Sequence, residues 1–108
     1  MSFNVKTISV FERQAKRLMK KIPSLKKEIQ TLISELKEEP IKGTSIGQDC
    51  HKIRLAIASK GKGKSGGARV ITHLVYKSDM VYLLSIFDKS DMENLSDKEI
   101  LELIKLIP

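Results

Sequence analysis

Two cationic residues alternate with apolar residues in one short segment of this sequence. In residues 50–58, CHKIRLAIA, Lys52 and Arg54 flank Ile53. A period of two is typical of a β-strand, so both side chains are expected on one face, about 7 Å apart along the strand. Strand packing does not require adjacent cations, which are explained either by ion pairs and solvation or by a phosphate-binding site. Arg69 opens the next predicted strand and joins the patch if the pairing register permits, where its planar guanidinium suits bidentate contact with phosphate.

Such a patch suits the cleavage of RNA. In that reaction the ribose 2′-OH attacks the adjacent phosphorus, negative charge develops on the phosphoryl oxygens, and the 5′-oxygen leaves. Preorganised cations stabilise this charge, usually with the help of a base and an acid. The reaction needs no metal, and the two His residues and one Cys have no ligand-like spacing. We therefore predict neither a metal site nor a cofactor.

A second cationic feature is the glycine-rich segment of residues 59–69, SKGKGKSGGAR. It predicts a flexible basic loop between two strands, which can follow a phosphate backbone through Lys60, Lys62 and Lys64. A plain hairpin loop is the simpler alternative. The segment also resembles a loosened phosphate-loop motif, but that motif needs a helix after it. Here two glycines and a β-branched strand follow, which disfavours nucleotide hydrolysis.

The composition is that of a small basic globular domain. The chain has 108 residues, a formal net charge of +7 and a sequence pI of about 9.6, which favour one domain over residues 1–108 and a polyanionic partner such as nucleic acid. The single Cys50 excludes an intrachain disulfide framework and fits a reducing compartment. The sequence contains no signal-peptide pattern and no apolar run long enough for a membrane span. We expect a cytoplasmic protein with no membrane partner.

Hydrophobic periodicity predicts an α+β fold. Ser9 with Glu12 and Ser96 with Glu99 have the spacing of capping boxes, and Ser24 is a candidate N-cap. Residues 41–49 are predicted to be a loop. The expected elements are a strand in residues 3–10, two antiparallel helices joined at residues 22–24, strands in residues 50–58, 67–76 and 80–87, and a helix from residue 96. This order predicts an N-terminal strand, a two-helix hairpin, a three-stranded antiparallel meander and a C-terminal helix.

Three stretches of the sequence resemble toxins of the RelE/ParE superfamily, and the nearest subgroup is HigB-type. They are CHKIRLAIASKGKGKSGGARVI, VYLLSIFDKS and LSDKEILELI, and the similarity runs over essentially the whole chain. The resemblance implies a helical hairpin packed on a twisted, mostly antiparallel sheet. It also implies a toxin that enters the ribosomal A site and cleaves mRNA there. Its partner would be a cognate antitoxin with a helix-turn-helix module, which binds operator DNA and masks the cationic face or displaces an element near it.

The resemblance also assigns residues. Lys52 and Arg54 match the strand lysines of the family, Arg69 matches the arginine that opens the next strand, and Lys89 matches a basic residue after the last strand. The Tyr that many members place near the C-terminal helix falls near Leu95 here, and Phe87 stands where related sequences often have Tyr; neither can transfer a proton. The predicted catalytic set is Lys52, Arg54, Arg69, Lys89 and His73, and the proton-transfer group remains open among Lys52, Lys89, His73, Asp88 and Asp91.

The histidines and the overall function each have alternatives. His51 alternates with Ile53 and Leu55, so it is expected to line the core or its edge. His73 shares strand parity with Arg69, but a packing or surface role is its alternative. Two rival functions are a ParE-like inhibitor of DNA gyrase and a non-enzymatic basic RNA-binding module. The cationic pair favours cleavage over gyrase binding, whereas the missing Tyr favours the binding module.

Overall fold

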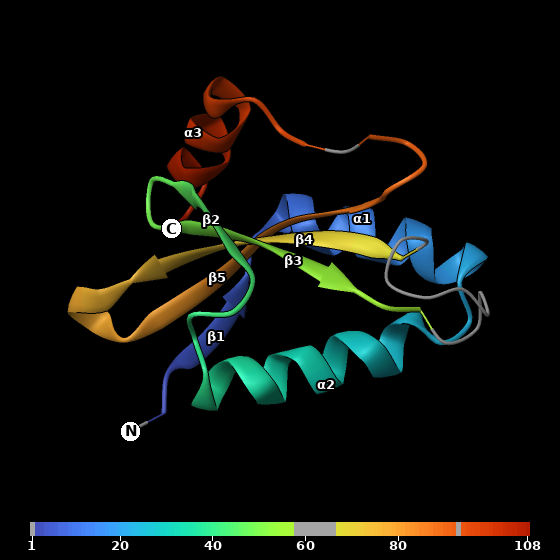
Figure 1. The fold of residues 1–108 in the computed structure, drawn as a ribbon, viewed down its shortest axis with the longest axis horizontal. Helices are drawn as coiled ribbons and strands as arrows, with labels where there is room; N and C mark the ends of the chain where they lie inside the picture. The colour runs from blue at the N-terminus through green and yellow to red at the C-terminus, as the bar shows by residue number, and fades with distance from the viewer. Residues whose placement is uncertain (1, 58–66, 93) are drawn as a thin grey trace.

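The computed structural model describes residues 2–57, 67–92 and 94–108, which form one mixed sheet with helices on both sides (Figure 1). The predicted Lys60, Lys62 and Lys64 lie outside the described residues. The elements are β1 (Asn4–Thr7), α1 (Ser9–Lys21), α2 (Leu25–Glu38), β2 (Thr44–Gly47), β3 (Cys50–Leu55), β4 (Ala68–Val75), a 3-10 turn (Tyr76–Ser78), β5 (Met80–Asp88) and α3 (Asp97–Lys105). Within this described part, no helix has the length and apolar character needed to span a bilayer.

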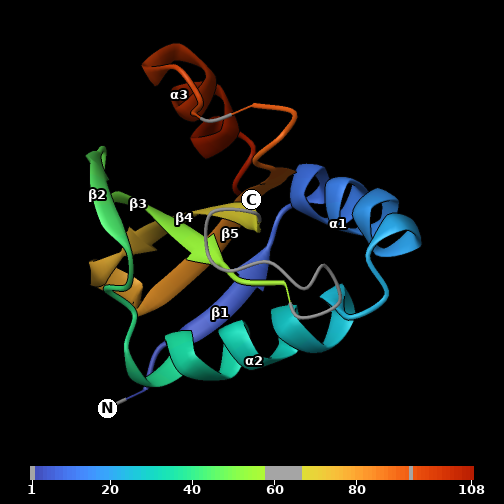
Figure 2. The ribbon, with the colours of Figure 1, turned by 45° about the vertical axis from the view of Figure 1, so that its right-hand side comes forward.

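The five strands have the order β1-β5-β4-β3-β2. β1 pairs with β5 in parallel, and the other three pairings are antiparallel. Figure 2 shows α1 and α2 on one side of the sheet and α3 on the other. The strands β4 and β5 are therefore covered on both faces, which explains why Val70, Ile71, Leu83 and Leu84 are all buried. The predicted α+β class and the helical hairpin are confirmed.

The prediction of a loop over residues 41–49 is wrong in part. Thr44–Gly47 forms β2, which extends the predicted three-stranded meander to four strands. A tight turn at Gln48 and Asp49, with φ values of 58° and 57°, returns the chain into β3. The strand was not recognisable because its residues are mostly polar and exposed, so that hydrogen bonding to β3 stabilises it instead of an apolar face.

The predicted helix starts have different outcomes. The capping box at Ser96 and Glu99 is confirmed, because the Ser96 hydroxyl accepts from the Glu99 N–H at 3.1 Å and the Glu99 carboxylate accepts from the Ser96 N–H at 2.9 Å. The box at Ser9 is wrong: α1 begins at Ser9 itself, and the Glu12 carboxylate accepts from the hydroxyl of Thr7. Ser24 does precede α2, but its hydroxyl donates to the Glu28 carboxylate at 2.9 Å.

A buried row of polar atoms crosses the centre of the sheet. His51 lies opposite Thr72, and both are buried, so the predicted place of His51 at the core or its edge is confirmed. Within the described residues, neither the Thr72 hydroxyl nor Nδ1 of His51 has a hydrogen-bond partner. A buried hydroxyl without a partner loses its hydration and gains nothing in return.

We predict that Thr72→Val stabilises the protein. The substitution exchanges the buried hydroxyl for a methyl group of similar size, so the free energy of unfolding should rise by about 1 kcal/mol. Urea denaturation measures the change. Thr44→Val, at an exposed position of β2, is the control and should shift stability by less than about 0.5 kcal/mol. A destabilised Thr72→Val would mean that the hydroxyl is hydrogen-bonded in solution.

Candidate phosphate-binding site

The pairing of β3 with β4 brings three cations to one face of the sheet. Arg54 lies directly opposite Arg69, and Lys52 lies opposite Ile71 in the adjoining row on that face. Opposed residues of antiparallel strands share a face, with Cα atoms about 4.5–5.5 Å apart. The predicted convergence of Arg69 with Lys52 and Arg54 is therefore confirmed. Ile53, between the two β3 cations, belongs to the core.

The environments of the three cations differ. Arg54 is exposed and Lys52 is half-buried, whereas Arg69 is only 3% exposed. The Arg69 guanidinium donates to the carbonyl of its neighbour Ala68 at 3.3 Å. A guanidinium held in this way is fixed before any ligand arrives, and its attraction to an anion is stronger in a water-poor site than in bulk solvent.

The described residues do not neutralise this face. The salt bridge found among them joins Lys42 to Glu35 at 3.6 Å, and none joins Lys52, Arg54 or Arg69 to a described carboxylate. The ion-pair explanation of the cations is therefore not supported for this part of the chain. Like charges directly opposite one another destabilise a strand pair. An anion bound between Arg54 and Arg69 would remove that repulsion. The pair is therefore suited to bind a phosphate group.

Lys89 and His73 lie toward opposite ends of the patch. The Lys89 N–H donates to the Gly67 carbonyl at 3.3 Å, which places Lys89 just beyond the Arg69–Phe87 pair. His73 is four residues from Arg69 on the same strand, or about 13 Å along it. The structure therefore brings Lys89 toward the arginine pair and leaves His73 apart from it.

His73 instead contacts the buried thiol of Cys50. Its Nδ1 lies 3.4 Å from Cys50 Sγ, and the two residues are cross-strand partners. Burial, and secondarily the charge of Asp49, raises the pKa of the Cys50 thiol to about 11. The thiol is therefore protonated at neutral pH and donates to the Gln48 carbonyl at 3.5 Å, while the direction of its contact with Nδ1 is set by the His73 tautomer. This contact favours the packing role that was the alternative for His73.

The other candidates for proton transfer lie near the end of β5. The Asp88 carboxylate accepts from the backbone N–H and the hydroxyl of Ser90, both at 3.0 Å. Asp91 is exposed and lines a hollow with Arg17 and Lys21 of α1. Leu95 packs against the core, as an inert residue would. With His73 placed beside Cys50, the candidates left for proton transfer are Lys52, Lys89, Asp88 and Asp91.

Two residues at the patch were missed by sequence reasoning. Lys42 and Thr44 line an open hollow of about 530 Å³ together with Lys52 and Arg54. In the sequence, only Gly43 indicated that the chain approaches this site. In the structure Gly43 has a φ of 92°, and a Cβ added to it would lie 2.4 Å from the Lys52 carbonyl oxygen. A glycine is required where the chain lies so close to the β3 backbone, and Lys42 directly precedes it at the start of this approach.

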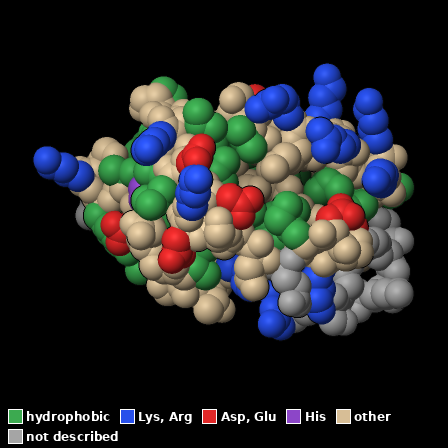
Figure 3. All heavy atoms as spheres, turned by 90° about the horizontal axis from the view of Figure 1, so that it is seen from above, with side chains coloured by type: hydrophobic (Ala, Val, Ile, Leu, Met, Phe, Trp, Pro, Cys, Tyr) green, Lys and Arg blue, Asp and Glu red, His purple; other side chains and the backbone are tan. Residues whose placement is uncertain are grey.

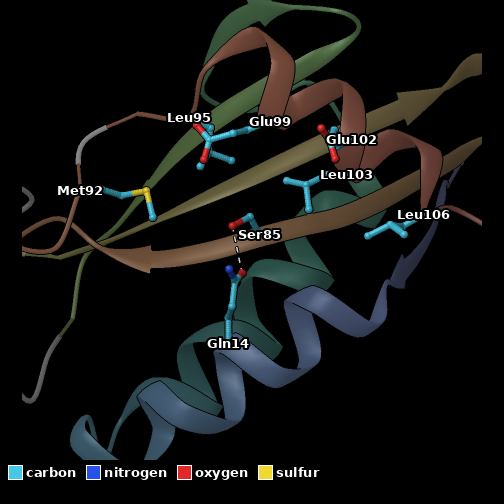
Figure 4. A pocket seen from close by; sticks show the side chains of 8 residues that line it. All are labelled: Gln14, Ser85, Met92, Leu95, Glu99, Glu102, Leu103 and Leu106. Atoms are coloured by element: carbon cyan, nitrogen blue, oxygen red, sulfur yellow. Dashed lines mark hydrogen bonds between the residues drawn. The ribbon is translucent and has the colours of Figure 1, made fainter.

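A different hollow lies between α1, β5 and α3 (Figure 4). It measures about 430 Å³, and its lining is mainly apolar with Glu99 and Glu102 at the α3 side. Gln14 reaches from α1 toward β5, where its side-chain oxygen accepts from the Ser85 hydroxyl at 2.9 Å and from the Ile86 N–H at 3.0 Å. This hollow shares no lining residue with the one beside Lys52 and Arg54, and its acidic and apolar lining does not suit phosphate.

The solvent-facing side of α1 carries a further group of cations. Figure 3 shows Lys and Arg side chains gathered toward one end of the molecule. The apolar stripe of α1 is buried, whereas its cations are all exposed and belong to no salt bridge with a described carboxylate. They are Arg13, Lys16, Arg17, Lys20 and Lys21. Together with the patch, this helix presents exposed positive charge of the kind that favours a polyanionic partner.

The structure is a small α+β domain with a cationic patch on an antiparallel strand pair. A family model described as the RelE toxin of the RelE/RelB toxin–antitoxin system matches residues 6–107. The chain belongs to this family of toxins, which confirms the resemblance at the level of the family and implies an antitoxin partner.

A solved structure shares the fold. It is a double arginine-to-alanine mutant of the Escherichia coli toxin RelE in the free state, with a TM-score of 0.62, 18% identity and coverage of 100% of both chains. At this identity the match shows the architecture alone. The predicted RelE-like fold is confirmed. Of the described strands, the one that the sequence did not predict is β2.

Proposed function

We propose that this toxin is a ribosome-dependent mRNA endonuclease. The observation that carries the proposal is the Arg54–Arg69 pair, two arginines that lie opposite each other on paired strands with Lys52 in the adjoining row. A protein that only binds a protein target has no need of such a site. Membership of the RelE family supports the same conclusion.

The proposed reaction is an attack of the ribose 2′-oxygen on phosphorus. The new 2′-O–P bond forms as the P–O5′ bond breaks, which leaves a 2′,3′-cyclic phosphate and a 5′-hydroxyl. The 2′-OH gives its proton to a base, and the 5′-oxygen receives one from an acid. Arg69 and Arg54 stabilise the charge on the phosphoryl oxygens, and Lys52 and Lys89 bind the neighbouring phosphates or transfer protons. No metal enters this scheme.

The remaining features suit a role on the ribosome. The glycine–lysine segment supports the HigB-type subgroup, and Lys60, Lys62 and Lys64 would contact RNA near the A site. The cations of α1 add attraction to ribosomal RNA. The proposed antitoxin carries a helix-turn-helix module that binds operator DNA, uses acidic residues against the cationic face, and keeps the toxin inactive in the cytoplasm.

The non-enzymatic RNA-binding module is the second candidate. It is favoured by the position of Leu95 and Phe87, which lie where family members often place Tyr and which pack in or against the core here. The gyrase inhibitor has no comparable observation in its favour.

We predict that Lys52→Gln lowers mRNA cleavage by about tenfold to a hundredfold, because one preorganised cation is removed from the charged transition state. The measurement is the mapping of mRNA 5′ ends on purified ribosomes incubated with each variant. Lys37→Gln, which removes an exposed cation from α2, is the matched control and should cleave normally. Codon-phased cuts that depend on Lys52 would support the endonuclease.

Two other outcomes would overturn the proposal. Inhibited gyrase with intact mRNA would indicate the gyrase inhibitor, and RNA binding without any new 5′ ends would indicate the non-enzymatic module.

A further inference from the structure

The ammonium group of Lys52 contacts a residue from a distant part of the chain. It donates to Oδ1 of Asn94 at 2.6 Å, across 42 residues of sequence. Asn94 belongs to the segment between β5 and α3, which leaves the end of β5 and returns over the sheet to α3 (Figure 1). This segment therefore brings a neutral amide to the rim of the cationic patch.

The position of Asn94 is fixed from its C-terminal side. The next residue, Leu95, packs against the core, and Ser96 forms the capping box with Glu99 at the start of α3. The hydrogen bonds from Ser96 also lower the pKa of the Glu99 carboxyl, so the charged form that accepts the bond is favoured. An exposed side chain next to these two fixed residues is better positioned to contact a ligand specifically than one on a free loop.

The contact with Lys52 determines which way the Asn94 amide faces. An ammonium group can only donate hydrogen bonds, so the amide oxygen must face Lys52 and the Nδ2 group must face away. Within the described residues, these two N–H donors have no partner, and Asn94 is exposed. The patch thus presents a pair of neutral donors beside Lys52, whose position on β3 adjoins the Arg54–Arg69 row.

Neutral donors and cations serve different purposes at a nucleic-acid site. Contacts from Lys and Arg to phosphate hold the backbone but carry no sequence information, whereas hydrogen bonds to base edges distinguish one base from another. A planar amide can donate to the carbonyl oxygens and ring nitrogens of an unstacked base. Asn94 is therefore suited to a base that adjoins a phosphate on Lys52.

We propose that Asn94 is a specificity-determining residue, which donates from Nδ2 to a base next to the cleaved phosphodiester while Lys52 orients its amide. This inference rests on the proposed endonuclease and deepens it. It predicts a preference for bases that present an acceptor at that position.

Asn94→Asp tests the inference directly. The carboxylate has nearly the same shape and still accepts from Lys52, but it has no N–H donors, so the preference should move away from acceptor edges and toward the amino groups of bases. We expect the ratio of cleavage at preferred to disfavoured nucleotides to change by about tenfold. The readout is sequencing of 5′ ends from ribosomes programmed with mRNA that is randomised around the A-site codon.

Asn94→Ala removes donors and acceptor together and should flatten the preference. Asn4→Asp, an exposed change of the same charge on β1, is the control and should keep the original preference. Equal loss of cleavage at every sequence, or an unchanged preference in an active Asn94→Asp, would overturn the inference and leave the endonuclease intact. Absence of cleavage by the unsubstituted toxin would overturn the endonuclease, and the inference with it.

Discussion

Arg69→Gln is expected to lower the rate of mRNA cleavage by about a hundredfold to a thousandfold, the loss found when one preorganised group that stabilises a developing oxyanion is removed. Arg69 is the buried member of the cross-strand pair, and its guanidinium is already held against the Ala68 carbonyl. In the proposed reaction it would act without rearrangement, because its position is already set by the fold. Single-turnover cleavage on programmed ribosomes measures this rate.

The same substitution should not weaken the fold. Arg69 lies directly opposite the like-charged Arg54 on the paired strand, without a salt bridge to any described carboxylate, so removing its charge should relieve repulsion. We expect the thermal midpoint of Arg69→Gln to stay the same or rise, as is common where a functional site is kept at some cost to stability. Arg69→Lys keeps the charge but loses the planar fork, and its rate should fall between the two.

Two results would contradict this assignment. A rate within threefold of the unsubstituted toxin would remove Arg69 from the reaction. A loss of activity that runs parallel to a lower thermal midpoint would indicate a structural role instead. Arg13→Gln, at an exposed position on α1, controls for the loss of one positive charge from the whole molecule.

Gly67→Ala should destabilise the protein by about 3 kcal/mol, the upper part of the range for an overpacked site. A Cβ at this position would lie 2.1 Å from the Leu55 carbonyl oxygen and 3.0 Å from the Leu55 carbonyl carbon. Both are backbone atoms, so no rotation of a side chain can relieve the clash. Gly67 also accepts the N–H of Lys89, so the shift would reach the end of the patch as well as the β3–β4 pairing.

Gly47→Ala provides the comparison for this effect. Gly47 has a φ of 85°, but a Cβ added there would meet nothing within 4 Å, so alanine adds backbone strain of about 1–2 kcal/mol without a clash. Urea denaturation of both variants separates the two causes. If Gly67→Ala costs no more than Gly47→Ala, the close approach of the two strands at Gly67 is not maintained in solution.

Local patterns in the sequence were sufficient for most of the fold. Apolar spacing identified both helices of the hairpin, and the capping box located the start of α3, because these signals depend on neighbours a few residues apart. Apolar spacing did not predict the strand β2, because its residues do not alternate between apolar and polar. Only its pairing with β3, which is a contact between segments, makes it a strand.

The candidate site also has one part that the sequence alone predicted and another that only the tertiary structure determined. Alternation alone placed Lys52 and Arg54 on one face of a strand, because successive side chains of an extended chain point to opposite sides. The sequence could not decide whether Arg69 and His73 belong beside them, since that depends on the register between strands. The register set Arg69 opposite Arg54 and His73 opposite Cys50. The contact of Asn94 with Lys52 was likewise decided by tertiary structure, because it joins residues 42 positions apart in the sequence.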